Sequence, residues 1–415
     1  MANIRRRVVV TGLGAITPIG NDIPSFWQNL LLGKSGAAKL SMDLTDMDVQ
    51  IGCEVKSFDP TRFMDPKLVR RTDRFTQFAL GAAAQALQDA RLDLAQEDPT
   101  RVGVIVGSGM GGILTWEAQF AQYLAKGPKR VSPLLIPMMI PDMAGGQIAI
   151  TYGLRGPNYT TTSACASGAH AASVAFRHIV RGDADVMITG GTEAAISRFT
   201  VAAFANMGAL SRRNHEPEKA SRPFDRGRDG FVIAEGAGIC VLEELSHAQA
   251  RGADIYCELA GYGATADAYH ITAPDPEAQG ACEVMRQALA DAGLRPQDID
   301  YINAHGTSTP LNDATEVLAI RRVFGDHARN LIINSTKSMI GHTLGAAGAL
   351  ELVVTALSIK QGKVHPTVNH EVPDEGVDLD FVPNGPRDVA IGAALSNSFG
   401  FGGHNCCLCL RALVS

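Results

Sequence analysis

The stretch SACASGAHAASVAF (residues 163–176) decides the fold, because a second stretch repeats its plan. In both, a short polar loop leads into a helix rich in glycine and alanine; the second copy is INSTKSMIGHTLGAAGALELVVTAL (residues 333–357). Two copies of one strand–loop–helix unit would meet at a pseudo-twofold axis, where small side chains let helices pack closely. We therefore predict two related halves, residues 1–255 and 256–415, in one body.

Strand and helix patterns alternate along the whole chain. Short apolar runs end in glycine or polar loops, which fits strands buried on both faces, and helical stretches lie between them. This alternation indicates an α/β protein. The expected strands are 7–14, 101–109, 184–191, 300–306 and 331–337, and the expected helices are 73–91, 115–125, 165–181, 279–293, 312–323 and 345–361.

The composition excludes several classes of protein. The chain has 415 residues and a net charge of −6, which argues against a general nucleic-acid binder. No apolar run reaches the ~18 residues that a membrane helix needs. The apolar block behind the basic start MANIRRR is too short for a signal peptide. We expect a cytoplasmic protein that binds neither membranes nor nucleic acid.

The cysteines and glycines give no sign of a metal or a bound cofactor. Cys406 and Cys409 in HNCCLCL (404–410) have C-x-x-C spacing, but a zinc site needs a second ligand pair, and none appears. The loop GSGMGG (107–112) is followed by a helix, whereas a dinucleotide site needs a second strand that ends in an acidic residue. We predict a strand with buried thiols near the end of the chain.

Cys165 stands out because only small or polar residues surround it. Thr161, Thr162 and Ser163 are helix-capping residue types, so the thiol is expected just before a helix N-terminus. The free N–H groups there favour the thiolate, lower the thiol pKa from ~8.5, and are suited to bind an oxyanion. Taken alone, Cys165 also fits an inert buried cysteine.

Three further residues make the inert interpretation of Cys165 hard to keep. NAHGTSTPLND (303–313) places His305 at the end of a strand, before three hydroxyl residues. STKSMIGHTLGAAG (335–348) places Lys337 and His342 in a loop before a helix. A single histidine in a long chain is usually structural, but a thiol, two imidazoles and an amine at matching strand ends indicate a catalytic site.

These residues resemble the β-ketoacyl-acyl-carrier-protein synthases, condensing enzymes of the thiolase superfamily. The shared motifs run from VVVTGLGAITPIG (8–20) to NSFGFGGHN (397–405) and include RPFDRGRDGFV (222–232) and AEGAG (234–238). The resemblance is closest to the elongating synthase II type. It implies an acyltransferase of fatty acid synthesis with a five-layered α/β/α/β/α thiolase-like fold, a homodimer, and acyl carrier protein as partner.

The resemblance also implies a role for each residue of the site. Cys165 would take the acyl chain, while His305 and His342 would bind the malonyl thioester and promote loss of CO2. Lys337 would set the charge near the histidines, and Glu351 would organise that network. The resulting carbanion would attack the acyl-Cys, which gives a 3-oxoacyl thioester two carbons longer.

Four further residues carry over with binding roles. The N–H groups of Cys165 and Phe401 would form the oxyanion hole, and Phe401 in FGFGG (399–403) would also gate the acyl pocket. Met110 occupies an acyl-tunnel position. Thr307 and Thr309 would hydrogen-bond the pantetheine arm. No metal or bound cofactor is implied, since the substrates travel on the phosphopantetheine of the carrier protein.

An acidic carrier protein requires a basic docking surface despite the negative net charge. In PKLVRRTDR (66–74) the basic residues fall at i, i+3, i+4 and i+7, which predicts one face of a helix. A second basic cluster matches the family. The docking candidates are Lys67, Arg70, Arg71 and Arg74 in the first cluster and Lys129 and Arg130 in the second.

Two departures and three alternatives remain. Ala234 stands where the family commonly has glycine, and His404 stands where threonine is usual, close to the oxyanion loop. A polyketide or specialised-lipid ketosynthase would share the chemistry. A coenzyme A-dependent thiolase would use a second cysteine, and a non-catalytic chain-length factor would lack Cys165.

Overall fold

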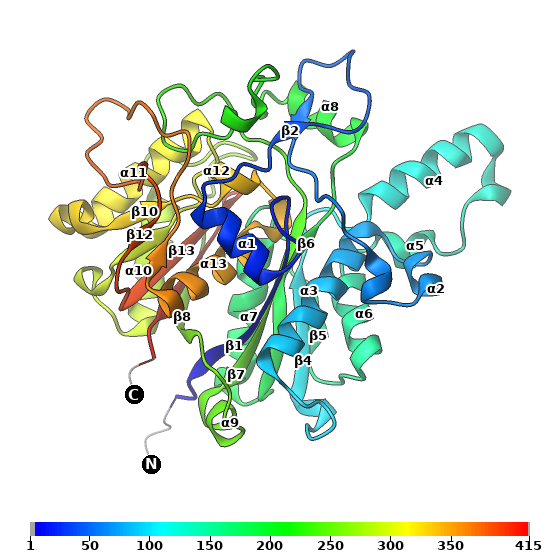
Figure 1. Cartoon of the computed structure of the whole chain (residues 1–415), viewed down its shortest axis with the longest axis horizontal. Helices are drawn as coiled ribbons and strands as arrows, with labels where there is room; N and C mark the ends of the chain where they lie inside the picture. Colours follow the sequence, from blue (N-terminus) through cyan, green and yellow to red (C-terminus); the bar gives the residue numbers. More distant parts are fainter. Residues whose placement is uncertain (1–4, 414–415) are drawn as a thin grey trace.

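The computed structural model describes residues 5–413 and has one large sheet at its centre (Figure 1). Ten strands join in the order β10-β9-β13-β14-β8-β1-β7-β6-β4-β5. In the first half they are β1 (Val8–Ile16), β4 (Val102–Gly107), β5 (Asn158–Tyr159), β6 (Val186–Glu193) and β7 (Gly236–Glu244). In the second half they are β8 (Cys257–Ala266), β9 (Tyr301–Asn303), β10 (Ile332–Asn334), β13 (Ala393–Gly400) and β14 (His404–Arg411).

The two halves of the sheet have the same pattern of strand pairing. In the first half β4 runs parallel to β5 and β6, while β6–β7 and β7–β1 are antiparallel. In the second half β9 runs parallel to β10 and β13, while β13–β14 and β14–β8 are antiparallel. The internal repeat that the sequence indicated is therefore present. Because β1 and β8 also pair over Val8–Val10, the halves form one continuous sheet rather than two separate ones.

Helices lie on both outer faces and between the halves. They are α1 (Ile23–Leu31), α2 (Pro66–Val69), α3 (Arg74–Ala90), α4 (Ile113–Lys126), α5 (Leu135–Met139), α6 (Met143–Tyr152), α7 (Ser167–Arg181), α8 (Arg198–Asn206), α9 (Leu245–Ala250), α10 (Gln279–Ala292), α11 (Pro310–Phe324), α12 (Lys337–Ile340) and α13 (Ala347–Gln361). The helix α3 covers the strands of the first half and α10 those of the second, while α7 and α13 contact strands of both. This layering and the strand pattern confirm the α/β class.

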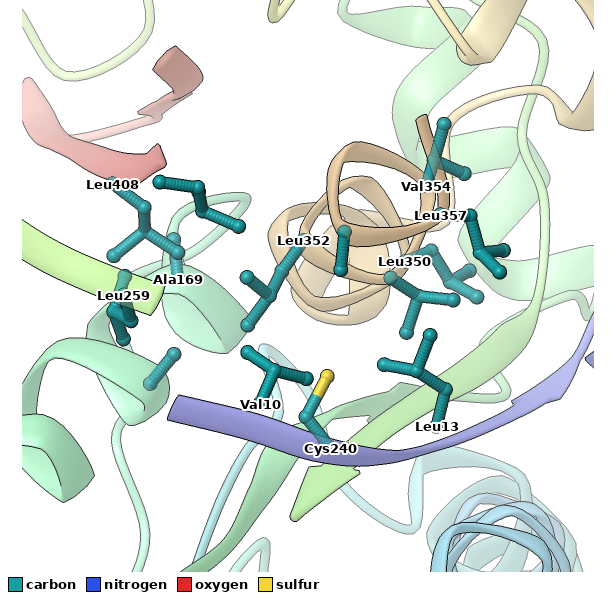
Figure 2. Packing of buried hydrophobic residues seen from close by; sticks show 14 of the residues in the cluster. Val10, Leu13, Ala169, Cys240, Leu259, Leu350, Leu352, Val354, Leu357 and Leu408 are labelled. Atoms are coloured by element: carbon teal, nitrogen blue, oxygen red, sulfur yellow. The ribbon is translucent and has the colours of Figure 1, made fainter. Parts of the chain in front are cut away.

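Small residues bring α7 and α13 together in the central layer. A Cβ on Gly168 would lie 2.9 Å from Ala349 Cβ, and a Cβ on Gly348 would lie 2.8 Å from Ala169 Cβ. The contact is reciprocal, as expected at a pseudo-twofold axis. Figure 2 shows the leucines and valines of α13 packed between strands of the two halves. The glycine- and alanine-rich repeat therefore lets the backbones of α7 and α13 pack closely, as the sequence predicted.

The central helix has the composition of a membrane span but lies in the core. In the described part of the chain, Leu344–Gln361 is the one stretch long and apolar enough to cross a membrane, and 83% of it is buried inside the protein. Such burial is typical of the core helix of a large α/β body. Gly348 and Glu351 interrupt the apolar sequence of this stretch, so it contains no uninterrupted apolar run of membrane-spanning length.

Most sequence-predicted elements are present, and one strand that was not predicted has a physical explanation. The five predicted strands correspond to β1, β4, β6, β9 and β10, the thiol-rich strand to β14, and the six predicted helices to α3, α4, α7, α10, α11 and α13. The strand β13 was missed because it buries polar residues, among them Ser396 and Asn397, in place of an apolar run.

The predicted basic helix over residues 67–74 is wrong. The helix α2 ends at Val69, and a new helix, α3, begins at Arg74 with Asp73 as its N-cap. The Asp73 side chain accepts hydrogen bonds from Phe75 N and from the Thr115 hydroxyl, so it stops the first helix and starts the second. Arg74 turns inward and pairs with Glu235 at 2.8 Å.

Candidate active site

Cys165 lies in a strained turn just before α7. The preceding residue, Ala164, has φ of +50°, a left-handed conformation that is unusual for alanine. The helix begins at Ser167 with Ala166 as its N-cap and no side-chain cap. The predicted placement of the thiol is confirmed, but capping by Thr161, Thr162 or Ser163 is not: the Thr161 hydroxyl donates to Ser167 O instead.

His305 follows β9, and a buried carboxylate fixes its backbone. Glu316 on α11 accepts the backbone N–H of His305 at 2.9 Å and that of Gly306 at 2.8 Å. The Asn397 amide donates to the same carboxylate at 3.1 Å. Sequence reasoning missed Glu316, although it lies one helical turn after Asp313 on a helix that directly follows the histidine loop.

A buried ion pair stands behind His305. Lys337 at the start of α12 donates to Glu351 on α13, and its Nζ lies 3.4 Å from His305 Nδ1. Both charged side chains are only 1% exposed. An ammonium group donates hydrogen bonds and accepts none, so His305 Nδ1 acts as the acceptor and the ring carries its proton on Nε2.

His342 has the same tautomer for a different reason. Its Nδ1 accepts the backbone N–H of Leu344 at 3.2 Å, which places the ring proton on Nε2. The His305 and His342 rings meet edge-on with centroids 5.4 Å apart. The site therefore presents two imidazole N–H donors from two loops, each fixed by a partner behind the ring.

Cys165, His305 and His342 line one cavity of about 480 Å³. Met110, Phe231 and Leu344 line it next to the thiol and pack in the same apolar cluster as Cys165. Thr307, Thr309, Asp267 and Asn312 are also among its lining residues. The cavity thus combines an apolar part, a nucleophile and polar walls, which suits a long substrate with an acyl end and a polar arm.

The prediction of a lowered thiol pKa is wrong for the protein without substrate. Burial raises the pKa of Cys165 to about 12, against the attraction of Lys337 and a hydrogen bond from the Phe401 backbone N–H, which both favour the thiolate. The thiol is therefore neutral at physiological pH. The nucleophile therefore starts as the thiol, and its proton has to leave during acyl transfer.

Both histidines are neutral. Burial, followed by the charge of Lys337, holds the pKa of His305 and of His342 well below its ordinary value near 6.5. Burial also raises the pKa of Glu351, although its ion pair with Lys337 opposes that rise. A positive charge placed beside two uncharged rings keeps them as N–H donors over the whole neutral pH range.

The glycine-rich loop after β13 approaches the thiol closely. A Cβ on Gly400 would lie 2.7 Å from Ser163 O and 3.2 Å from Cys165 N, so only glycine fits there. Phe401 lines the cavity and its N–H points at the sulfur. His404 is exposed and packs behind the loop against Gly402, outside the cavity lining.

Met110 lines the cavity on a loop that a second buried carboxylate holds in place. Glu193, the last residue of β6, accepts the N–H groups of Met110 at 3.1 Å, Gly109 at 2.7 Å and Gly345 at 3.0 Å. Glu193 therefore ties the Met110 loop to the turn before α13. Sequence reasoning missed it, although an acidic residue at the end of a buried strand is a usable signal.

The remaining candidates lie on the cavity wall and on the protein surface. Thr307 and Thr309 line the cavity and their hydroxyls hydrogen-bond each other at 2.8 Å. The basic side chains are exposed on short, separate elements rather than on one helix: Lys67, Arg70 and Arg71 around α2, and Lys129 and Arg130 in the turn after α4. Arg74 is withdrawn from this set by its ion pair.

Comparison with known families identifies both halves of the chain. The model of the beta-ketoacyl synthase N-terminal domain matches residues 5–248, and that of the beta-ketoacyl synthase C-terminal domain matches residues 256–371.

Individual proteins resemble the chain over nearly its whole length. A protein named 3-oxoacyl-[acyl-carrier-protein] synthase 2 from Staphylococcus aureus (strain COL) is 51% identical over 407 residues, which is 98% of each chain. One of the same name from Coxiella burnetii is 51% identical over 97% of each chain. A solved type II polyketide ketosynthase, in complex with its acyl-carrier protein and bound to a hexaketide, is 36% identical with a TM-score of 0.92 and covers 99% of this chain and 100% of its own.

Proposed function

The chain belongs to the beta-ketoacyl synthase family, and on that premise we propose that it elongates acyl chains in fatty acid biosynthesis. The reaction is a decarboxylating Claisen condensation that joins malonyl-acyl-carrier protein to an acyl group held on Cys165. Its products are CO2 and a 3-oxoacyl-acyl-carrier protein longer by two carbons. The observation that carries the proposal is the cavity that one thiol shares with two neutral imidazole N–H donors.

The first step transfers the acyl chain to Cys165. The sulfur attacks the thioester carbonyl of acyl-carrier protein, the new C–S bond forms, and the bond to the pantetheine sulfur breaks. The thiol proton ends on the departing pantetheine thiolate, so no net charge is left in the buried site. The backbone N–H groups of Cys165 and Phe401 stabilise the oxyanion of the tetrahedral intermediate.

The second step generates a carbanion without a strong base. The malonyl thioester oxygen accepts hydrogen bonds from Nε2–H of His305 and His342 while the C–C bond to the carboxylate breaks. Electrons from that bond form an enolate, whose negative charge the two donors stabilise. Lys337 keeps the rings neutral, and Glu351 holds Lys337 in place.

The third step forms the new carbon–carbon bond. The enolate carbon attacks the acyl carbonyl on Cys165, and the same two N–H groups receive the oxyanion. When the intermediate collapses, the C–S bond breaks and the cysteine leaves as a thiolate, which takes up one proton from water; this is the proton that the overall decarboxylating condensation consumes. Because Cys165 is acylated before malonyl thioester reacts, ping-pong kinetics are expected.

Two kinds of support favour this function over its alternatives. The identity to proteins named synthase 2 is 51%, against 36% to the polyketide ketosynthase. A thiolase needs a second cysteine at the reaction centre, whereas Cys406, Cys407 and Cys409 are buried in β14 and do not line the cavity. The presence of Cys165 argues against a non-catalytic chain-length factor.

The partner in this proposal is acyl carrier protein. Exposed basic residues around α2 and after α4 supply a surface for an acidic protein, and Thr307 and Thr309 supply hydroxyls for its pantetheine arm. The binding of carrier protein by the polyketide ketosynthase supports this assignment. We also propose that the reaction takes place in the cytoplasm and needs no dedicated cofactor.

We propose further that two copies of the chain associate. The strand β5 lies at the edge of the sheet with both residues exposed, so it is free to pair with another strand. The helix α4, which projects from the body in Figure 1, exposes Phe120, Tyr123 and Leu124 at 47%, 44% and 69%. An edge strand and an apolar helix on one half favour a symmetric dimer through that half.

Light scattering in solution tests the dimer. We expect the mass of two chains for the native protein and of one chain for Phe120→Asp/Leu124→Asp, because buried carboxylates disrupt an apolar contact. Leu32→Asp is the matched control: Leu32, the C-cap residue of α1, is 71% exposed and its replacement should leave the mass unchanged. A native protein with the mass of one chain would exclude the dimer.

Intact-mass spectrometry tests the function. Mixing the protein with acyl-carrier proteins of graded chain length should add one acyl group, on the peptide that contains Cys165 and not on Cys165→Ala. Adding malonyl-acyl-carrier protein should then discharge the acyl-enzyme with release of CO2. Labelling from acyl-coenzyme A without CO2 release would favour a thiolase, and products with several unreduced two-carbon additions would favour a polyketide ketosynthase.

A further inference from the structure

The motif RPFDRGRDGFV (222–232) has no role in the mechanism described so far, yet it lies between the two histidine loops. At its C-terminal end, Val232 O accepts the backbone N–H of His342 at 2.8 Å, and Ala234 N donates to His342 O at 3.0 Å. The Phe231 ring meets the His342 imidazole edge-on at 5.2 Å. This end of the motif therefore braces the loop that carries His342.

The N-terminal part of the motif braces the turn after His305. The backbone N–H of Arg222 donates to Ser308 Oγ at 2.9 Å, and Gly230 N donates to Ser308 O at 3.1 Å. Ser308 has φ of +68°, a conformation that costs energy in any residue with a side chain. Ser308 separates Thr307 from Thr309, so this strained turn determines where both hydroxyls point.

Arg228 adds four side-chain hydrogen bonds to these backbone contacts. Its Nε donates to Thr309 O and its Nη2 to Pro310 O, both at 3.1 Å, while Nη1 binds Asp225 O and Asp374 Oδ2 at 2.8 Å. The side chain is 6% exposed. A planar guanidinium is the one side chain that can serve three carbonyls and a carboxylate at fixed angles in this way.

The positive charge of Arg228 lies next to the N-terminus of α11, where the helix dipole is also positive. Thr309 is the N-cap of α11, and a cation is disfavoured at a helix N-terminus. Asp313 in the first turn of α11, whose carboxylate is fully buried and lies 3.7 Å from Arg228 Nε, compensates that cost. General stabilisation of α11 therefore does not explain Arg228, whereas holding the Thr309 and Pro310 carbonyls does.

We infer that Arg228 is a positioning residue for the pantetheine arm: it fixes the turn that presents the Thr307 and Thr309 hydroxyls to the cavity. The inference rests on the proposed function, in which that arm carries both substrates. An arm held equally in the ground state and the transition state affects KM rather than kcat. Arg228 thus acts on both acyl- and malonyl-carrier protein and leaves the thiol itself unchanged.

Steady-state kinetics of Arg228→Lys test this positioning role. We expect KM for acyl- and malonyl-carrier protein to rise about tenfold, the effect of losing one or two hydrogen bonds, with kcat within about twofold of the native value. The rate at which iodoacetamide alkylates Cys165 should not change, because this small reagent does not use the arm. Combining Arg228→Lys with Thr307→Val and Thr309→Val should raise KM no further than the two threonine replacements alone, since Arg228 acts through both hydroxyls.

Arg222→Lys is the matched control. Arg222 is equally buried in the same motif and pairs with Asp225 and Glu371, but its side chain does not touch the turn at 307–310. Its replacement should leave KM unchanged. If Arg228→Lys does not fold, Asp374→Ala removes one anchor of Arg228 and should raise KM in the same direction by a smaller factor.

The outcomes separate this inference from the proposed function. A native protein that does not elongate acyl chains refutes the function. A native protein that elongates them, with native KM in whichever of these two variants folds, refutes only the role of Arg228. A slower alkylation of Cys165 in Arg228→Lys would show a general distortion of the site and would also overturn the assignment.

Discussion

Cys165→Gln is expected to abolish chain elongation, by at least about a thousandfold, while CO2 is still released from malonyl-acyl-carrier protein. Glutamine has no nucleophile, so no acyl-enzyme forms. Its side-chain carbonyl resembles that of an acylated cysteine and is placed to accept hydrogen bonds from the N–H groups of Cys165 and Phe401. His305 and His342 keep their partners behind the rings, so the enolate is still stabilised.

Two measurements check this result separately. Mass spectrometry of the reaction mixture reports elongated carrier protein, and release of labelled CO2 reports decarboxylation. Cys282→Ala is the control, because this cysteine is also buried and unpaired but lies on α10 outside the cavity; both activities should persist. Elongation by Cys165→Gln would mean that another group carries the acyl chain.

Lys337→Met should reduce decarboxylation about a hundredfold at neutral pH. Methionine has a similar length but cannot donate to His305 Nδ1, so the ring proton is no longer held on Nε2. It also leaves Glu351 buried without its partner, which raises the pKa of that carboxyl further and leaves it protonated. The loss is larger than for a surface lysine because all three groups are buried.

The pH profile of Lys337→Met should move in a defined direction. The neutral imidazole is the active form, so activity falls as the pH drops through the pKa of the rings. Burial, and after it Lys337, lowers that pKa well below 6.5 in the native protein. Without the lysine charge the pKa rises, and the acid limb of the CO2-release profile moves to higher pH.

Lys360→Met, on the last turn of α13, is the control for this change. Lys360 is partly exposed and pairs with Asp254 far from the cavity, so its replacement should leave both rate and pH profile as in the native protein. An acid limb that stays in place in Lys337→Met would show that Lys337 does not set the charge state of the histidines.

The elements that the sequence predicted correctly are those with strong local signals. The pattern of small residues at 163–176 and 333–357 predicted two helices in close contact, and Gly168 and Gly348 meet Ala349 and Ala169 as expected. Strand ends rich in glycine predicted where His305, Lys337 and His342 would lie. These signals depend on residues within a few positions of each other, which a single sequence displays directly.

The errors arose where neighbours in space, not in sequence, decide the outcome. The spacing of Lys67, Arg70, Arg71 and Arg74 fits a helix face, but the Asp73 cap, bound to Thr115, breaks that helix, and Glu235 draws Arg74 inward. The Asp73 cap was a readable local signal, whereas the partners Thr115 and Glu235 were not. Glu193, Glu316 and Arg228 were missed for the same reason, since their importance comes from the loops that they join.

The sequence by itself determined the class of fold, the repeat, the family and the identity of the reacting groups, because residue type and periodicity carry that information. Tertiary structure alone decided the protonation state and the tautomer of those groups. The thiol pKa of Cys165 rises because the core removes water from it, and the tautomers of His305 and His342 follow from Lys337 Nζ and Leu344 N. A pKa and a tautomer depend on all groups that surround the side chain in space, through solvation and hydrogen bonding. Which groups these are is decided only when the chain folds.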